Sequence, residues 1–235
     1  PTEKHNGWKF IAFGPDGKLY VPVGAPCNIC KSDDPYASLT RIDTNGNNLE
    51  VVQRGIRNTV GFTWHPDTKE LWFTDNGRDM MGDDMPNCEL NHAPKDFMHF
   101  GYPFCHEGSL PDPEFGKGQD CSKYTAPVAK MGAHTAPLGI RYIRNPQLPE
   151  TYNEAFLIAR HGSWNRTEKS GYDVQLVKTN ASGQFISMQP FITGWLSKDK
   201  KEVWGRPVDI QMLPDGDILI SDDYANCIYR VSYKQ

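Results

Sequence analysis

The chain has 235 residues, a mass of 26.6 kDa and a formal net charge of −4, because 25 Lys and Arg are outnumbered by 29 Asp and Glu. Proteins that bind nucleic acid or anionic membranes need an excess of Lys and Arg, so the composition argues against both partners. No stretch approaches the 18 or so apolar residues of a membrane span, and we expect none. The 21 Gly and 18 Pro predict a turn-rich globular chain.

Two β-hairpins are predicted in the first third of the chain. In the first, residues 8–13 and 18–21 flank the turn Pro15-Asp16-Gly17, and in the second, residues 60–64 and 70–74 flank Pro66-Asp67. Proline presets φ for a turn, aspartate bonds its own backbone, and glycine tolerates positive φ. Each segment therefore reads as two antiparallel strands joined by a turn.

The same pattern returns twice in the second half. A looser copy runs from Gly139 through Pro149 to residues 155–159, and the last runs from Val208 through Pro214 to residues 217–222. The turn prolines are spaced by at least the roughly 40 to 50 residues that one four-stranded propeller blade occupies. The sequence thus predicts an all-β fold, a β-propeller with about four blades in this chain.

Residues 77–133 interrupt this pattern. They are rich in Pro, Gly and Asp, contain three cysteines and show little alternation, so we expect a long ordered loop insertion there. The whole chain, 1–235, is then a single propeller domain or the C-terminal part of one. Because the first strand begins near Trp8, we expect blades upstream of this chain, and an upstream segment that completes the propeller is one expected partner.

The six cysteines and two glycosylation sequons, at Asn165 and Asn180, favour a secreted, extracellular or periplasmic protein. The chain starts at Pro1 with no leader, which suggests a mature product. A zinc site is disfavoured because Cys27 and Cys30 have no second pair at ligand spacing. Six cysteines permit 15 pairings, so the connectivity stays open. Our first choice is Cys105 with Cys121, and the second is Cys27 with Cys30.

Several phrases along the chain resemble the sorbosone dehydrogenase-like branch of the pyrroloquinoline quinone (PQQ) dependent sugar dehydrogenases. They are Gly55 to Phe62, Leu71 to Asp79, Gly82 to Asp84, Phe100 to Pro103, His161 to Arg166, Trp204 to Pro207 and Ser221 to Asp223. The resemblance implies a six-bladed propeller that holds PQQ and Ca²⁺, with about two blades before the start of this chain. It also implies oxidation of a sugar, a sugar aldehyde or a related alcohol, with electrons passing to an external acceptor.

Three residues of these phrases suit a tricarboxylate such as PQQ. Arginine forks bind carboxylates bidentately, so Arg57 and Arg206 are candidate cofactor clamps, and Asn58 can offer its amide to the quinone or a carboxylate. The alternative is that both arginines tie neighbouring blades together through backbone carbonyls.

An acidic run after the second hairpin suggests a cation site, since Ca²⁺ prefers carboxylate and carbonyl oxygens in flexible loops. Its members are Asp75, Asp79, Asp83 and Asp84. The resemblance implies that the backbone carbonyls of Gly77 and Arg78 hold the calcium ion. A solvated acidic turn is the alternative meaning of the same run.

The resemblance implies that His5 is the catalytic base, and an imidazole suits taking a hydroxyl proton at neutral pH; an ordinary terminal histidine is the alternative. The soluble glucose dehydrogenases place a carboxylate partner near Ala25 and a cofactor-binding lysine at His161, so the chain departs from them at both positions. His161, Arg160 or Arg166 could replace that cation. His134 and Thr135 resemble another cofactor-side turn.

Two other functions compete with a quinoprotein oxidoreductase. One is a non-catalytic propeller that binds protein or carbohydrate, and the other is a Ca²⁺-dependent lactonase. Serine hydrolysis is disfavoured because Gly162-Ser163-Trp164 does not extend to a nucleophile elbow.

Overall fold

The computed structural model describes residue 2 and residues 4–233, and it is built almost entirely from β-strands. The first sheet contains β1 (Ala12–Phe13), β2 (Leu19–Val23), β3 (Ser38–Ile42), β4 (Glu50–Arg54) and, parallel to β4, β8 (Met98–His99). The second contains β5 (Phe62–Trp64), β6 (Leu71–Asp75), β7 (Asn87–Ala93) and β11 (Ala129–Ala133).

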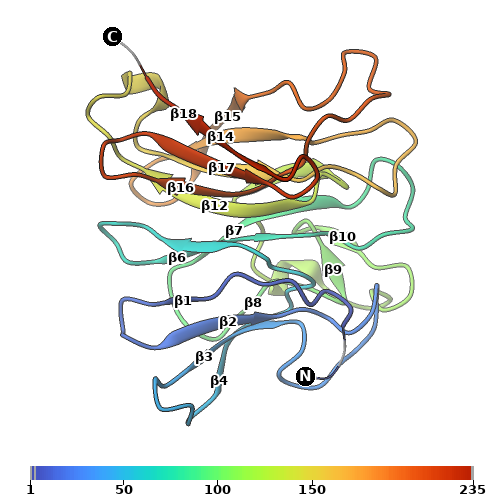
Figure 1. Ribbon diagram of the computed structural model, residues 1–235. Helices are drawn as coiled ribbons and strands as arrows, with labels where there is room; N and C mark the ends of the chain where they lie inside the picture. The colour runs from blue at the N-terminus through green and yellow to red at the C-terminus, as the bar shows by residue number, and fades with distance from the viewer. Residues whose placement is uncertain (1, 3, 234–235) are drawn as a thin grey trace.

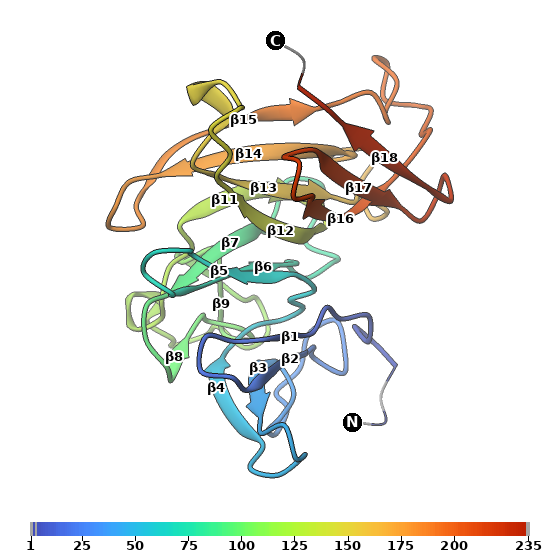
Figure 2. The ribbon, with the colours of Figure 1, turned by 60° about the vertical axis from the view of Figure 1, so that its left-hand side comes forward.

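Two further sheets complete the series. The third contains β12 (Pro137–Ile143), β13 (Ala155–Arg160), β14 (Asp173–Thr179) and β15 (Phe185–Ile192), and the fourth contains β16 (Pro207–Met212), β17 (Ile218–Asp222) and β18 (Cys227–Val231). A small pair, β9 (Cys105–His106) with β10 (Leu110–Pro111), and two short 3₁₀ helices, Cys121–Lys123 and Glu150–Tyr152, lie in the connections. Figures 1 and 2 show the first sheet at one end of the molecule, the second in the middle and the other two at the far end.

The four predicted hairpins are confirmed. Pro15, Pro66, Pro149 and Pro214 each lie between the first two strands of a sheet, and those strands pair antiparallel in every case. In the first turn Gly17 has φ of +76°, which few other residues adopt without strain. The turns therefore occupy equivalent places in four successive sheets.

Apolar layers hold neighbouring sheets together. Because side chains alternate along a strand, Phe156 and Ile158 of β13 pack toward Trp72 of the second sheet, while Leu157 packs toward Ile210 of the fourth. Both faces of β13 are thus buried, which explains the unbroken apolar run there. A third layer, around Phe62, lies between the first and second sheets.

The expected loop insertion at 77–133 needs correction, because it contains five strands, β7 to β11, of which β7 and β11 are the longest. β7 and β11 belong to the second sheet, and the true excursion is the stretch between them. On β7 the polar Glu89 and Asn91 are as buried as Leu90, so the strand lacks the alternation that the sequence analysis looked for.

Both proposed disulfides are present: Cys105 bonds Cys121, and Cys27 bonds Cys30. In the loop-entropy picture, closing a loop of about 15 residues is worth about 3 kcal/mol. The other two cysteines are free thiols, Cys88 buried and Cys227 exposed. No helix in the described part of the chain is long and apolar enough to cross a membrane.

Candidate functional site

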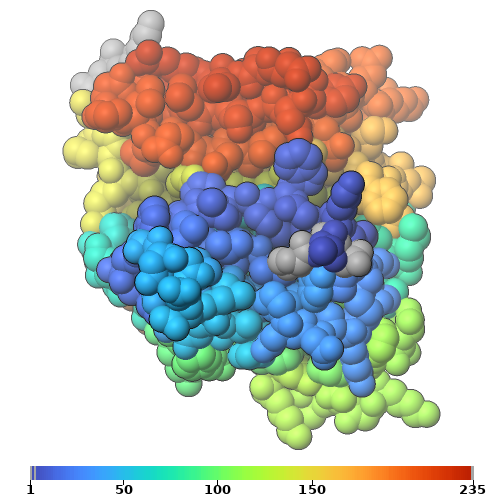
Figure 3. All heavy atoms as spheres, turned by 60° about the horizontal axis from the view of Figure 1, so that its bottom comes forward, coloured from blue at the N-terminus to red at the C-terminus, as the bar shows by residue number. Residues whose placement is uncertain are grey.

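A cleft of about 230 Å³ opens where the segment ahead of β1 meets the loops around β5, β6 and β12. We call it the site cleft, and its lining includes His5, Asn6, Arg57, Asn58, Asn76, Gly77, Asp79, His134 and Trp164. Figure 3 shows the N-terminal part of the chain, in blue, on the surface near this region. Six residues that the sequence analysis singled out thus gather at one place, although they come from segments far apart in the chain.

Arg57 is buried at the base of this cleft and uses all five of its N–H groups inside the protein. Nε donates to the Asn28 carbonyl (2.8 Å), Nη1 donates to the Asn76 and Gly77 carbonyls (3.2 and 2.8 Å), and Nη2 donates to Asn28 Oδ1 and Asp79 Oδ2 (2.9 and 3.2 Å). The geometry follows the alternative interpretation, in which the arginine ties loops together through backbone carbonyls.

Asn58 is held on three sides. Its backbone N–H donates to Asp75 Oδ1 (2.6 Å), its carbonyl accepts a bond from Asn76 Nδ2 (3.0 Å), and its Oδ1 accepts one from Lys9 Nζ. Its Nδ2 has no hydrogen-bond partner among the described residues, and the residue lines the site cleft. Asn58 therefore presents an amide donor to any occupant.

Asp75 supports this loop and does not face the cleft as a ligand. Its Oδ2 accepts the Arg57 backbone N–H (2.9 Å), and Oδ1 accepts that of Asn58. Burial raises the pKa of Asp75 to about 6, although these hydrogen bonds oppose the shift. The carboxylate acts as a structural acceptor behind the cleft.

Arg206, His161 and Thr135 do not line the site cleft. The Arg206 guanidinium donates to the His161 and Gly162 carbonyls (3.0 and 2.7 Å) and lies 5.5 Å from the Tyr172 ring centroid. Thr135 is buried and donates to a backbone carbonyl. Burial lowers the pKa of His161, whose Nε2 lies 2.8 Å from Asp223. Arg206 therefore lies outside the cleft that Arg57 and Asn58 line.

The four acidic residues of the 75–84 run do not converge either. Asp79 pairs with Arg57, Asp84 pairs with Arg166 (3.0 Å), and Asp83 accepts the Thr167 backbone N–H. Within residues 2 and 4–233, no group of three or more His, Cys, Asp or Glu is arranged to hold a metal ion. Arginines offset these negative charges, so the carboxylates of the run do not form a Ca²⁺ site among the described residues.

The Arg78 side chain has a separate structural task. Its Nη1 donates to Asp112 Oδ2 (2.6 Å), and His106 Nε2 lies 2.9 Å from the same oxygen. Burial opposes the ionisation of Asp112, but the hydrogen bonds from His106 and Arg78 outweigh it and lower the pKa to about 2. This buried cluster anchors the excursion between β7 and β11 to the loop that follows β6.

The two histidines of the cleft differ. His134 is buried, and its Nε2 donates to the Gly82 carbonyl (2.8 Å) while Nδ1 lies 3.6 Å from Asp79. His5 is exposed at the cleft. The sequence analysis missed Lys9, which lies behind Asn58, although a lysine inside the apolar run 8–13 was a signal that could have found it.

Glu89, on β7, gives the molecule a testable pH dependence. Burial, together with the nearby negative Asp75, raises its pKa from 4.5 to about 8. The folded state then binds more protons than the unfolded state between those values, so the free energy of unfolding falls as pH rises, by about 1.4 kcal/mol per pH unit. We expect Glu89→Gln to remove this slope in urea titrations from pH 5 to 8.

The substitution is sterically mild. A glutamine at this position can accept the Glu107 backbone N–H that Glu89 Oε1 accepts now (2.7 Å). Asn91 Nδ2 now donates to Glu89 Oε2 (2.9 Å), and a flip of the Asn91 carboxamide would let its Oδ1, which has no partner among the described residues, accept from the glutamine NH₂. Glu168→Gln, at an exposed ion pair with Lys200, is the matched control and should keep the slope. An unchanged slope in Glu89→Gln would show that the carboxylate is ionised normally.

Comparison with known proteins gives two family models that match the chain and one similar protein. The glucose/sorbosone dehydrogenase family model matches residues 1–163, and a TrAA12-like model matches residues 98–234. A protein of Borreliella burgdorferi without an assigned function is 34% identical over 236 residues, covering 100% of this chain and 62% of that protein. The chain therefore spans less than two thirds of this relative's length.

Solved structures share the fold. A Trichoderma reesei family AA12 enzyme superposes with a TM-score of 0.77 at 19% identity, covering 94% of this chain and 66% of its own. The PQQ domain of Coprinopsis cinerea pyranose dehydrogenase gives 0.72 at 17%, covering 94% and 68%. The PQQ-bound aldose sugar dehydrogenase of Streptomyces coelicolor gives 0.64 at 21%, covering 92% and 55%. At these identities the likeness establishes the fold alone.

Proposed function

Because the chain belongs to the glucose/sorbosone dehydrogenase family, we propose that it forms part of a quinoprotein oxidoreductase that acts on a sugar, a sugar aldehyde or a related alcohol. The observation that supports this most is the site cleft, where His5, Asn58, Arg57, Gly77 and His134 meet although they are far apart in sequence. Two neighbours of the same fold are described as PQQ-containing.

The residues of the cleft fit an anionic, carbonyl-rich cofactor in one respect and not in another. The Asn58 amide, whose Oδ1 accepts from Lys9 and whose Nδ2 has no partner among the described residues, suits a carboxylate or carbonyl oxygen. Arg57, whose N–H groups are all used, would shape the cleft and not clamp the ligand directly. Bound PQQ would supply the quinone that accepts hydride, and His5 would take the hydroxyl proton of the substrate.

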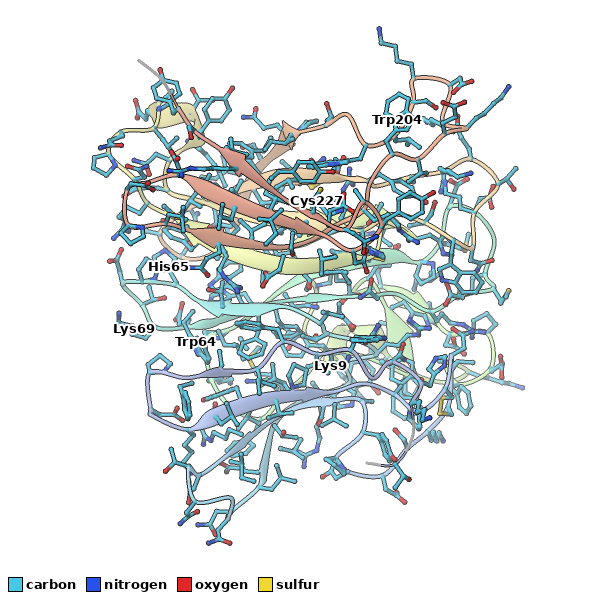
Figure 4. The ribbon with its side chains drawn as sticks, viewed as in Figure 1. Lys9, Trp64, His65, Lys69, Trp204 and Cys227 are labelled. Carbon is cyan, nitrogen blue, oxygen red and sulfur yellow. A yellow bond between two sulfur atoms is a disulfide. The ribbon has the colours of Figure 1, made fainter. Side chains whose placement is uncertain are left out.

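We include in this proposal that the four sheets are blades of a six-bladed propeller completed by further sheets. Large apolar side chains are exposed on the outer faces of the series: Trp8 (90%) and Phe13 (62%) near the first sheet, and Trp204 (56%) and Ile228 (66%) near the fourth. Figure 4 shows Trp204 at the edge of the molecule. Partner sheets would bury such groups. The two disulfides support an exported protein.

The test is direct. Add PQQ to the protein, with and without CaCl₂, follow tryptophan fluorescence and the absorbance spectrum, and then add an aldose or a sugar aldehyde with an artificial electron acceptor. We expect saturable binding and a spectrum that the substrate bleaches. Calcium is varied because one neighbour of the same fold is a calcium structure, whereas the donor set here does not favour the ion. Absence of PQQ binding, also in a chain of the relatives' full length, would favour the non-catalytic binding module.

A further inference from the structure

Lys9 is half-buried next to the site cleft. Figure 4 shows it on the segment ahead of β1, away from His65 and Lys69 at the left edge of the view. Its Nζ donates to the Thr59 carbonyl (2.8 Å) and to Asn58 Oδ1, and it lies beside a second cleft, of about 260 Å³, that His5 also lines. A buried ammonium group needs such partners, because it loses its water on folding.

The contacts around Asn58 give Lys9 a defined role. Backbone groups and Asp75 fix the main chain of Asn58, and among the described residues only the bond from Lys9 fixes the rotation of its carboxamide. With Oδ1 bonded to the lysine, Nδ2 is the free donor of a residue that lines the site cleft. A Cβ at Gly24 would lie 3.2 Å from Nζ and only 2.6 Å from Asn6 Cβ, so this glycine leaves the room that the lysine head occupies.

We propose that Lys9 is a positioning residue, which holds the Asn58 carboxamide as a fixed donor for a carboxylate or carbonyl oxygen in the site cleft. The inference rests on the proposed function for the identity of the ligand, but the orientation of Asn58 is a property of the free protein. Burial lowers the pKa of Lys9 to about 7. The negative charge of Asp75 opposes this shift, and the positive charge of Arg57 adds to it. His5 and Tyr36 are the other titratable groups beside it, across the second cleft.

The decisive measurement is the position of the Asn58 side-chain NH₂ resonances in a ¹⁵N-labelled protein, assigned by their loss in Asn58→Asp. We expect them to titrate with a midpoint near pH 7 in the wild type and in His5→Ala. Lys9→Met should shift these resonances and abolish their titration. In Lys9→Arg the resonances should lie at their wild-type position but should not titrate near pH 7. Lys18→Met, at a partly exposed lysine of the same hairpin that pairs with Asp43, is the matched control and should leave them unchanged.

Ligand binding is the second measurement. We expect Lys9→Met to weaken PQQ binding about tenfold to hundredfold, as loss of a fixed donor to a charged oxygen should, with Lys18→Met unchanged. Asn58 resonances identical in Lys9→Met and the wild type would overturn the positioning role, even if binding weakened. If PQQ does not bind the wild type, the proposed function fails, and the resonances still decide whether Lys9 positions Asn58.

Discussion

Arg57→Ala should destabilise the protein by about 3–5 kcal/mol, because it removes one partner of a buried ion pair. The carboxylate of Asp79 and the carbonyls of Asn28, Asn76 and Gly77 would lose their donors together. The arginine side chain is only 6% exposed, so water cannot replace those bonds without opening the loops. Urea unfolding at neutral pH measures the loss, and PQQ affinity should fall with it because the cleft loses its shape.

Arg54→Ala is the matched control. This neighbouring arginine pairs with Asp34 at 2.6 Å, but both side chains are largely exposed, 43% and 55%. Exposed pairs contribute at most about 1 kcal/mol. Arg57→Lys, which keeps the charge but cannot form the five-bond fork, should fall between the two. Equal effects of Arg57→Ala and Arg54→Ala would mean that the buried network is not essential to the loops.

His5→Ala should lower the turnover of a sugar substrate by about 10² to 10⁴-fold, the usual cost of losing a general base. Affinity for PQQ should stay within a factor of about two, since His5 is exposed at the mouth of the cleft while Asn58 and Arg57 lie deeper. Steady-state rates with an artificial acceptor, combined with fluorescence titration of PQQ, separate the two effects.

His65→Ala is the matched control for that experiment. His65 follows β5 at the other end of the molecule, where its ring packs 4.5 Å from that of Tyr142 (Figure 4), and we expect unchanged turnover. Turnover of His5→Ala within threefold of the wild type would exclude His5 as the base. His134, the other imidazole of the cleft, would then be the candidate base.

Local sequence determined the strands and turns of this protein. The Pro15, Pro66 and Pro214 turns each combine a fixed φ with side chains that bond their own backbone, and such signals act within a few residues. The same locality allowed Cys105 to be matched with Cys121 across a short loop. Where the signal was not local it failed: β7 looked like a loop because its polar Glu89 and Asn91 are buried, and Glu89 has its backbone partner at Glu107, distant in sequence.

Sequence and tertiary contacts also determined different properties of the candidate site. The family resemblance pointed to His5 and Gly77, the chemistry of its amide pointed to Asn58, and the fold brings these three to one cleft. The direction in which each side chain points was decided only by tertiary contacts. Arg57 turns inward because Asn28, Asn76 and Asp79, all far away in the chain, offer it acceptors, and Arg206 turns toward His161 and Gly162 for the same reason. A guanidinium binds whichever oxygens the fold places around it, and no short stretch of sequence states which oxygens those are.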